Sequence, residues 1–148
     1  MNKFRDTEAQ QLLILLKLDA LRLFERIKHR APEYLNIFSN RRTREHFPEI
    51  FKNRYDGIGL FDLKKCSEDV IIGLDQFYTQ VDELRWYLGQ TQDMPGTVSD
   101  KVYAIISDLE HAHDTLALYI DAELGISPKA EDVVKIEDDV PEDSEEQI

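Results

Sequence analysis

The sequence predicts an all-α protein, an antiparallel helical bundle of three long helices plus one or two short helices, with a disordered acidic C-terminal tail. Apolar residues recur at steps of three and four over three long stretches, which is the spacing of one helix face. The last stretch of the chain, residues 127–148, holds nine acids, two lysines and no aromatic residue, a composition typical of disorder. We therefore divide the chain into a helical domain, residues 1–126, and the acidic tail, residues 127–148.

The first long helix is predicted from Thr7 to about Arg30. Thr7 and Gln10 have the spacing of a capping box, and Pro32 pushes Ala31 out of helical geometry. One face holds Leu13, Leu16, Ala20, Leu23 and Ile27. A second apolar stripe beside it holds Ile14, Leu18 and Leu21. A helix with so wide an apolar surface is usually central or shared with another chain, so the sequence also predicts a possible homodimer.

Residues 32–63 are the least regular part of the helical domain. Pro32 and Pro48 each occupy a position where a first-turn proline begins a short helix. Asp56 and Gly57 then predict a turn.

Residues 32–63 are the second part of the chain. The third and fourth parts are long helices joined by a short loop. The third is predicted from about Leu63 to Leu88 with Gly89 as its C-terminal cap, and its internal Gly73 indicates a close helix contact. The fourth is predicted to begin with a cap at Thr97 and to end at Gly125. The short loop requires the two helices to be antiparallel.

Composition excludes several classes of protein. The net charge of −12 argues against nucleic-acid binding. Cys66 is the only cysteine, so no internal disulfide is possible and an oxidising compartment is not indicated. The apolar run from Leu12 to Leu16 is far shorter than the roughly 18 residues that span a bilayer. These observations predict a cytoplasmic protein without a membrane span.

Residues 22–54 depart from this acidic balance, because they hold nine bases and four acids. Basic side chains alternate there with aromatic ones, a pattern that favours an acidic or phosphate-bearing partner or the protein's own acidic tail. The alternative is a solvated loop that balances the acidic helices. The predicted partner-binding residues are Arg41, Arg42, Arg44, Phe47, Phe51, Lys52, Arg54 and Tyr55.

The acidic tail contains a second candidate contact. Val133, Val134 and Ile136 are branched apolar residues beside acids, a combination that can add as a strand to a partner's sheet. The stretch resembles a SUMO-interacting motif. A soluble tail with incidental valines is the competing interpretation.

The strongest metal candidate is the pair Glu110 and His113, which share a helix face at the Glu-x-x-His spacing of di-iron bundles. Such bundles need a second copy of this spacing, and the sequence has none. His111 is the candidate for a histidine phosphorelay, but acidic neighbours would repel a phosphoryl group. The competing interpretation of His113 is a packed core residue.

No pattern of nucleophilic catalysis or phosphate binding is present, and Cys66 lies at a buried position of the third helix. No cofactor is expected. The sequence therefore predicts a non-catalytic protein–protein interaction protein, such as an adaptor, a regulator or a small chaperone. The alternative is a metal-binding or phosphorelay bundle centred on Glu110, His111 and His113.

Overall fold

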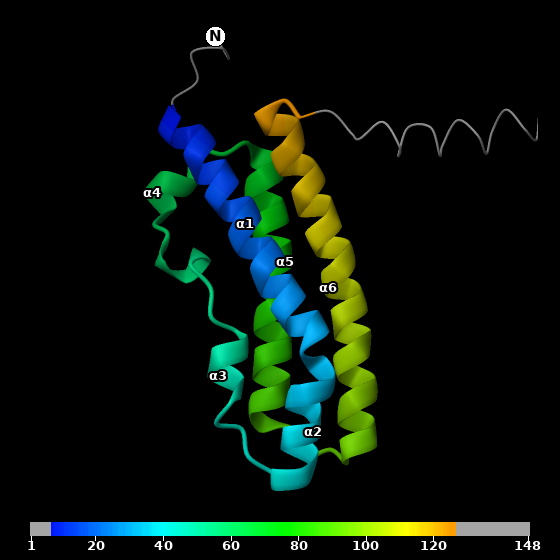
Figure 1. Cartoon of the computed structure of the whole chain (residues 1–148). Coiled ribbons are helices and arrows are strands. Elements are labelled where there is room, and N and C mark those ends of the chain that lie inside the picture. Colours follow the sequence, from blue (N-terminus) through cyan, green and yellow to red (C-terminus); the bar gives the residue numbers. More distant parts are fainter. Residues whose placement is uncertain (1–6, 127–148) are drawn as a thin grey trace, which may run out of the picture.

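The computed structural model describes residues 7–126, and the regular elements in this range are all helical. This confirms the all-α prediction. Figure 1 shows three long helices side by side: α1 (Thr7–His29), α5 (Glu68–Gln90) and α6 (Pro95–Leu124). The acidic tail, with its predicted contacts Val133, Val134 and Ile136, lies outside the described residues.

The first two helices run in the same direction, with a break at Arg30. α1 ends at His29, close to the predicted Arg30, but Ala31 is not pushed out of helical geometry: it begins α2 (Ala31–Arg41), with Pro32 in the first turn. Arg42 ends α2 in the left-handed region, with φ of 55°. The five positions predicted for the inner face of α1 are all buried, which shows that the helical spacing identified the core.

Between α2 and α5 the chain returns along the side of the long helices. We call residues 42–59 the crossing segment. It contains the single-turn helix α3 (Phe47–Ile50), which has Pro48 in its first turn, and the 3-10 turn η2 (Tyr55–Gly57). A second single-turn helix, α4 (Leu60–Leu63), follows it. Figure 1 shows this return path beside α1 and α5.

The third long helix begins later than its spacing predicts. α5 starts at Glu68, where the Ser67 hydroxyl accepts a hydrogen bond from the Val70 amide at 3.3 Å, and Leu63 belongs to α4 instead. Gly89 lies inside the last turn of α5 and is not its cap. A helical spacing continues across such a break because both helices bury the same side of the chain.

The last helix begins earlier than predicted. α6 starts at Pro95 with Met94 before it, so Thr97 lies inside the first turn rather than at the cap. Proline suits this place because its missing N–H would have no partner in the first turn. The predicted end is confirmed, since Gly125 adopts a φ of 81° and closes α6.

Gly73 allows α5 and α6 to approach closely. A Cβ at this position would lie 3.2 Å from Leu116 Cδ1 and 3.3 Å from Tyr119 Cδ2, both on α6. The close contact indicated by the sequence is therefore present, and the absence of a side chain at Gly73 accommodates it.

A pair of glycine substitutions tests this contact. Gly73→Val should lower the free energy of unfolding by about 1–3 kcal/mol, because the added atoms must displace Leu116 or Tyr119. Gly89→Ala should raise it by up to about 1 kcal/mol, because a Cβ there meets nothing within 4 Å and alanine favours the helix. Urea unfolding of both variants would measure the difference, and an equal effect of the two would contradict the assigned contact.

Candidate partner-binding groove

Arg44 attaches the beginning of the crossing segment to the end of α5. Its Nε donates a hydrogen bond to the Leu88 carbonyl at 2.9 Å, and its terminal nitrogen donates to the Thr91 carbonyl. The guanidinium also lies over the Phe38 ring, 5.1 Å from its centroid. A cation at a helix C-terminus satisfies carbonyls that have no partner within the helix. Arg44 therefore has a structural role.

Arg26 of α1 holds the middle of the crossing segment. Its guanidinium donates to the Ile50 carbonyl at 3.1 Å and to the Lys52 carbonyl at 2.7 Å. The Phe47 and Phe51 side chains are 5% and 3% exposed, so they anchor α3 in the core. These contacts place the chain after Phe51 beside α1.

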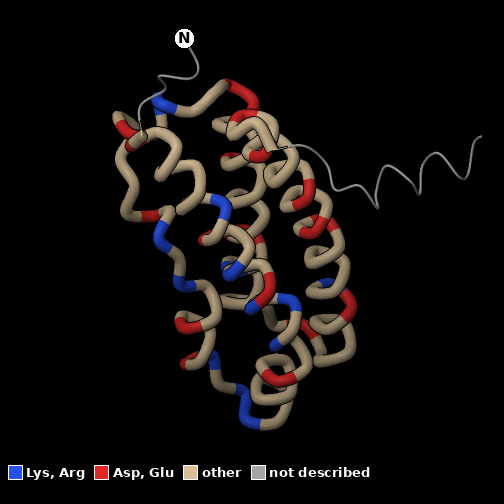
Figure 2. The backbone as a smooth tube through the Cα atoms, turned by 45° about the horizontal axis from the view of Figure 1, so that its top comes forward, with Lys and Arg blue, Asp and Glu red and all other residues tan. Residues whose placement is uncertain are grey.

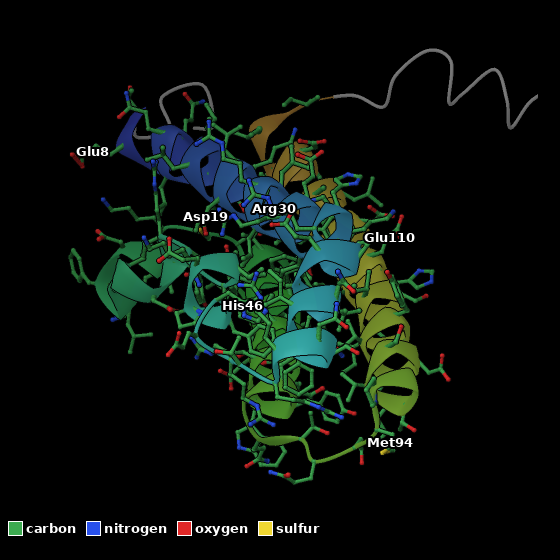
Figure 3. The ribbon with its side chains drawn as sticks, turned by 60° about the horizontal axis from the view of Figure 1, so that its bottom comes forward. Glu8, Asp19, Arg30, His46, Met94 and Glu110 are labelled. Carbon is green, nitrogen blue, oxygen red and sulfur yellow. The ribbon has the colours of Figure 1, made fainter. Side chains whose placement is uncertain are left out.

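Asp19 holds the end of the crossing segment. Its carboxylate accepts a hydrogen bond from the Arg54 amide at 2.8 Å and another from the Tyr78 hydroxyl of α5 at 2.6 Å. The rings of Tyr55 and Tyr78 stack with their centroids 3.9 Å apart. Figure 3 shows Asp19 on the side of α1 that faces this part of the chain. Burial first, and the Asp19 carboxylate second, hold the pKa of Tyr78 far above its usual value.

The attached segment leaves a basic hollow of about 420 Å³ against α1. Leu15 and Leu18 line it, and they are 52% and 39% exposed. The rest of the lining holds four bases, one acid and one amide: Asp19, Arg22, Arg26, Lys52, Asn53 and Arg54.

An apolar hollow of about 490 Å³ adjoins the basic one on the α5 side, and Lys52 and Asn53 line both. Its remaining lining combines aromatic rings and proline with bases: Arg44, Phe47, Pro48, Phe51, Asp56, Arg85 and Gly89. We call the two hollows together the partner groove. An apolar floor bordered by cations suits an anionic group attached to an apolar body.

A third hollow of about 270 Å³ bounds the partner groove on the α5 side. It has the opposite charge, since Asp56, Asp75 and Asp82 line it with Arg85 as its single base. An acidic ligand in the partner groove would therefore be repelled from this side, which limits where it can bind.

The structure divides the eight partner-binding residues predicted from the sequence. Lys52 and Arg54 line the basic hollow, and Arg44, Phe47, Phe51 and Lys52 line the apolar one. Tyr55 lines the third hollow, against Tyr78. Arg41 and Arg42 are exposed at the end of α2 and line none of these three hollows. The Phe47 and Phe51 rings are packed in the core, so only a small part of each is open to the apolar hollow.

The alternation of basic and aromatic residues in the sequence does not identify several residues of the groove. Leu15, Leu18, Arg22 and Arg26 come from α1, and Arg85 comes from α5, far from the crossing segment in sequence. The excess of bases over residues 22–54 already included Arg22 and Arg26. Which of those bases shared a surface depended on the chain's return beside α1.

The metal and phosphorelay candidates lie apart from the groove. His113 is a packed residue, because its ring stacks on Phe24 with centroids 5.0 Å apart. Glu110 forms an ion pair with Lys28 of α1 at 3.2 Å, and His111 is exposed on α6. Among residues 7–126, no group of three potential metal ligands comes together. Figure 3 shows Glu110 and Asp19 on different sides of the molecule.

Charge is separated between the groove and the two C-terminal long helices. Residues 68–124, from the start of α5 to the end of α6, contain twelve acids but only two bases, Arg85 and Lys101. Figure 2 shows acidic positions along these helices, and most of the basic positions on α1 and along the part of the chain between α1 and α5. The electrostatic potential therefore differs between these two regions of the surface.

Comparison with known proteins found no matching family model, no matching curated protein and no matching solved structure. None of the helices between residues 7 and 126 is both long enough and apolar enough to cross a membrane.

A matched pair of arginine substitutions separates the structural from the exposed bases. Arg44→Ala should lower the free energy of unfolding by about 1–3 kcal/mol, because the Leu88 and Thr91 carbonyls lose their donor. Arg41→Ala should change it by less than about 0.5 kcal/mol, because Arg41 is exposed. Equal stability of the two variants in urea would show that Arg44 does not hold α5.

The raised pKa of Tyr78 predicts that the folded protein loses stability at alkaline pH. Its pKa is raised in the folded protein above the ordinary value of 10.0, so above about pH 10 the unfolded chain loses this proton first. The free energy of unfolding should therefore fall as the pH rises above 10, and Tyr78→Phe should make this fall shallower. Urea unfolding from neutral pH to about pH 11 measures both slopes. An unchanged slope in the variant would contradict the role of Tyr78.

Proposed function

We propose that this chain is a non-catalytic protein–protein interaction protein, an adaptor, regulator or small chaperone, whose partner groove binds an acidic segment carrying an apolar side chain. One observation supports this above all. The apolar hollow has Phe47, Phe51 and Pro48 in its lining, while Lys52 is shared with an adjoining hollow that holds three further bases. The apolar part of a ligand would thus bind in the apolar hollow, and its negatively charged group would bind in the basic one.

The charge of the whole chain favours a peptide over a nucleic acid. A nucleic acid carries regularly spaced phosphates and would approach the acidic α5–α6 pair as well as the groove. A peptide offers a few carboxylates beside one or two apolar residues, which matches the small extent of the basic surface. Repulsion from the acidic helices would also orient such a peptide.

The expected energies indicate a modest affinity. Burial of one branched or aromatic side chain contributes about 1.5–3 kcal/mol, and each exposed ion pair contributes about 0.2–1 kcal/mol. The cost of association offsets part of this gain. The apolar hollow would thus supply most of the affinity, and the bases would supply selectivity for acids.

A possible homodimer belongs to the same proposal. Ile14 of the second apolar stripe is 46% exposed, so this face of α1 points outward. Such a face supports a second copy as one partner of an interaction protein.

Selection from a phage-displayed library of random peptides on the full-length chain tests the proposal. The enriched peptides should combine Asp or Glu with branched or aromatic residues, because the groove combines bases with an apolar floor. Arg22→Glu with Arg54→Glu should weaken a selected peptide about tenfold, which corresponds to about 1.4 kcal/mol of lost attraction and added repulsion.

The control is Arg41→Glu with Lys64→Glu, which changes the net charge equally at exposed residues outside the groove linings. Its affinity for the selected peptide should stay within about twofold of the original chain, since distant exposed charges are screened by salt. Enrichment of basic peptides, or equal weakening by the two pairs, would overturn the proposal.

A further inference from the structure

The partner groove has an order along α1. Leu15 and Leu18 lie nearer the N-terminus of α1, and Arg22 and Arg26 follow toward its C-terminus. Lys52 and Arg54 line the same hollow from the crossing segment. A ligand lying along α1 in this direction would meet exposed leucines first and bases afterwards.

The acidic tail has the same order. Val133, Val134 and Ile136 come first, and the three acids Glu137, Asp138 and Asp139 follow directly. The tail carries nine acids against two lysines, whereas the basic hollow has four bases and one acid. From N-terminus to C-terminus, the apolar residues of the tail thus match the leucines of the basic hollow, and the acids that follow match its bases.

The path from α6 to the groove is short enough for the tail. The ion pair of Lys17 with Asp121, at 2.6 Å, places the end of α6 beside the N-terminal half of α1. The seven residues from Ile126 to Val133 span at most about 25 Å. Half the circumference of a helix about 11 Å across is about 17 Å, so this length suffices to pass around α1.

We propose that residues 133–139 of the acidic tail bind in the partner groove of their own chain. The apolar residues Val133, Val134 and Ile136 would contact Leu15 and Leu18, and the following acids would meet Arg22, Lys52 and Arg54. This inference rests on the proposed function, and it names the tail as the competitor that an outside acidic segment must displace.

Attachment to the same chain makes a weak contact sufficient. A short linker holds its ligand at an effective concentration of the order of millimolar, so an intrinsic dissociation constant near 1 mM already half-fills the groove. At physiological salt the Debye length is about 8 Å, which restricts the attraction to near contact and makes it sensitive to salt. An outside partner of moderate affinity can then displace the tail.

Carbodiimide cross-linking of the full-length chain tests the contact, because it joins a lysine amine only to a carboxylate in direct contact with it. Lys52 is 71% exposed and should link to Glu137, Asp138 or Asp139, as peptide mass spectrometry would show. Its 3.3 Å ion pair with Glu49 provides an internal check that Lys52 reacts. Exposed Lys64, outside the groove linings, is the control lysine and should give no more than background links to the tail.

Mixing the chain with a ¹⁵N-labelled copy before cross-linking separates the possible occupants. Tail links to Lys52 within one isotope support the proposal. Links between isotopes would make a second copy the occupant, and the absence of tail links beside a successful Lys52–Glu49 link would also overturn the inference. High salt should reduce the tail links and leave the bundle's helical circular dichroism unchanged.

A tail variant gives an independent readout. Val134→Ser with Ile136→Ser, made in the full-length chain, removes the apolar side chains without adding acids, so it should lose most of the Lys52 links and bind a library-selected acidic peptide about twofold more tightly, because a half-filled groove is freed of its competitor. Unchanged peptide affinity would overturn the inference while leaving the proposed function intact. If no peptide binds either the original chain or the tail variant, and no tail links form, both proposals are overturned.

Discussion

The Asp19 carboxylate is the contact on which the candidate site depends. It joins three parts of the chain, because it lies on α1 and accepts hydrogen bonds from the Arg54 amide and from the Tyr78 hydroxyl of α5. Hydrogen bonds to a charged group each contribute about 1.5–3 kcal/mol, more than an exposed ion pair. The crossing segment has no long helix of its own. Its position beside α1, and with it the basic hollow, follows from this carboxylate and from Arg26.

The basic residues of the chain have two different tasks. Arg26 and Arg44 donate to backbone carbonyls, and in this way they supply hydrogen-bond partners to an irregular segment and a helix end. Arg22, Lys52 and Arg54 keep exposed side chains around the groove. The internal arginines therefore position the outer bases, so the high count of bases in this region reflects structure as well as proposed binding.

Helical spacing predicted most of the fold because burial repeats with the helix turn. The inner face of α1, the break before Pro32 and the end of α6 at Gly125 are all where the sequence places them. The beginning of α5 was missed, because α4 buries part of Leu63 in phase with the next helix and hides the break. Caps and short helices depend on single hydrogen bonds, which a spacing pattern does not reveal.

The sequence by itself determined that the chain is helical, that its acids and bases are unevenly placed, and that residues 41–55 combine bases with aromatic rings. Only the tertiary structure decided that Phe47 and Phe51 are packed in the core and that Arg44 serves α5. It also brought Leu15 and Arg22 of α1 beside Lys52. The reason is physical: a residue's type sets the contacts that it can make, but the path of the chain selects which of these it makes.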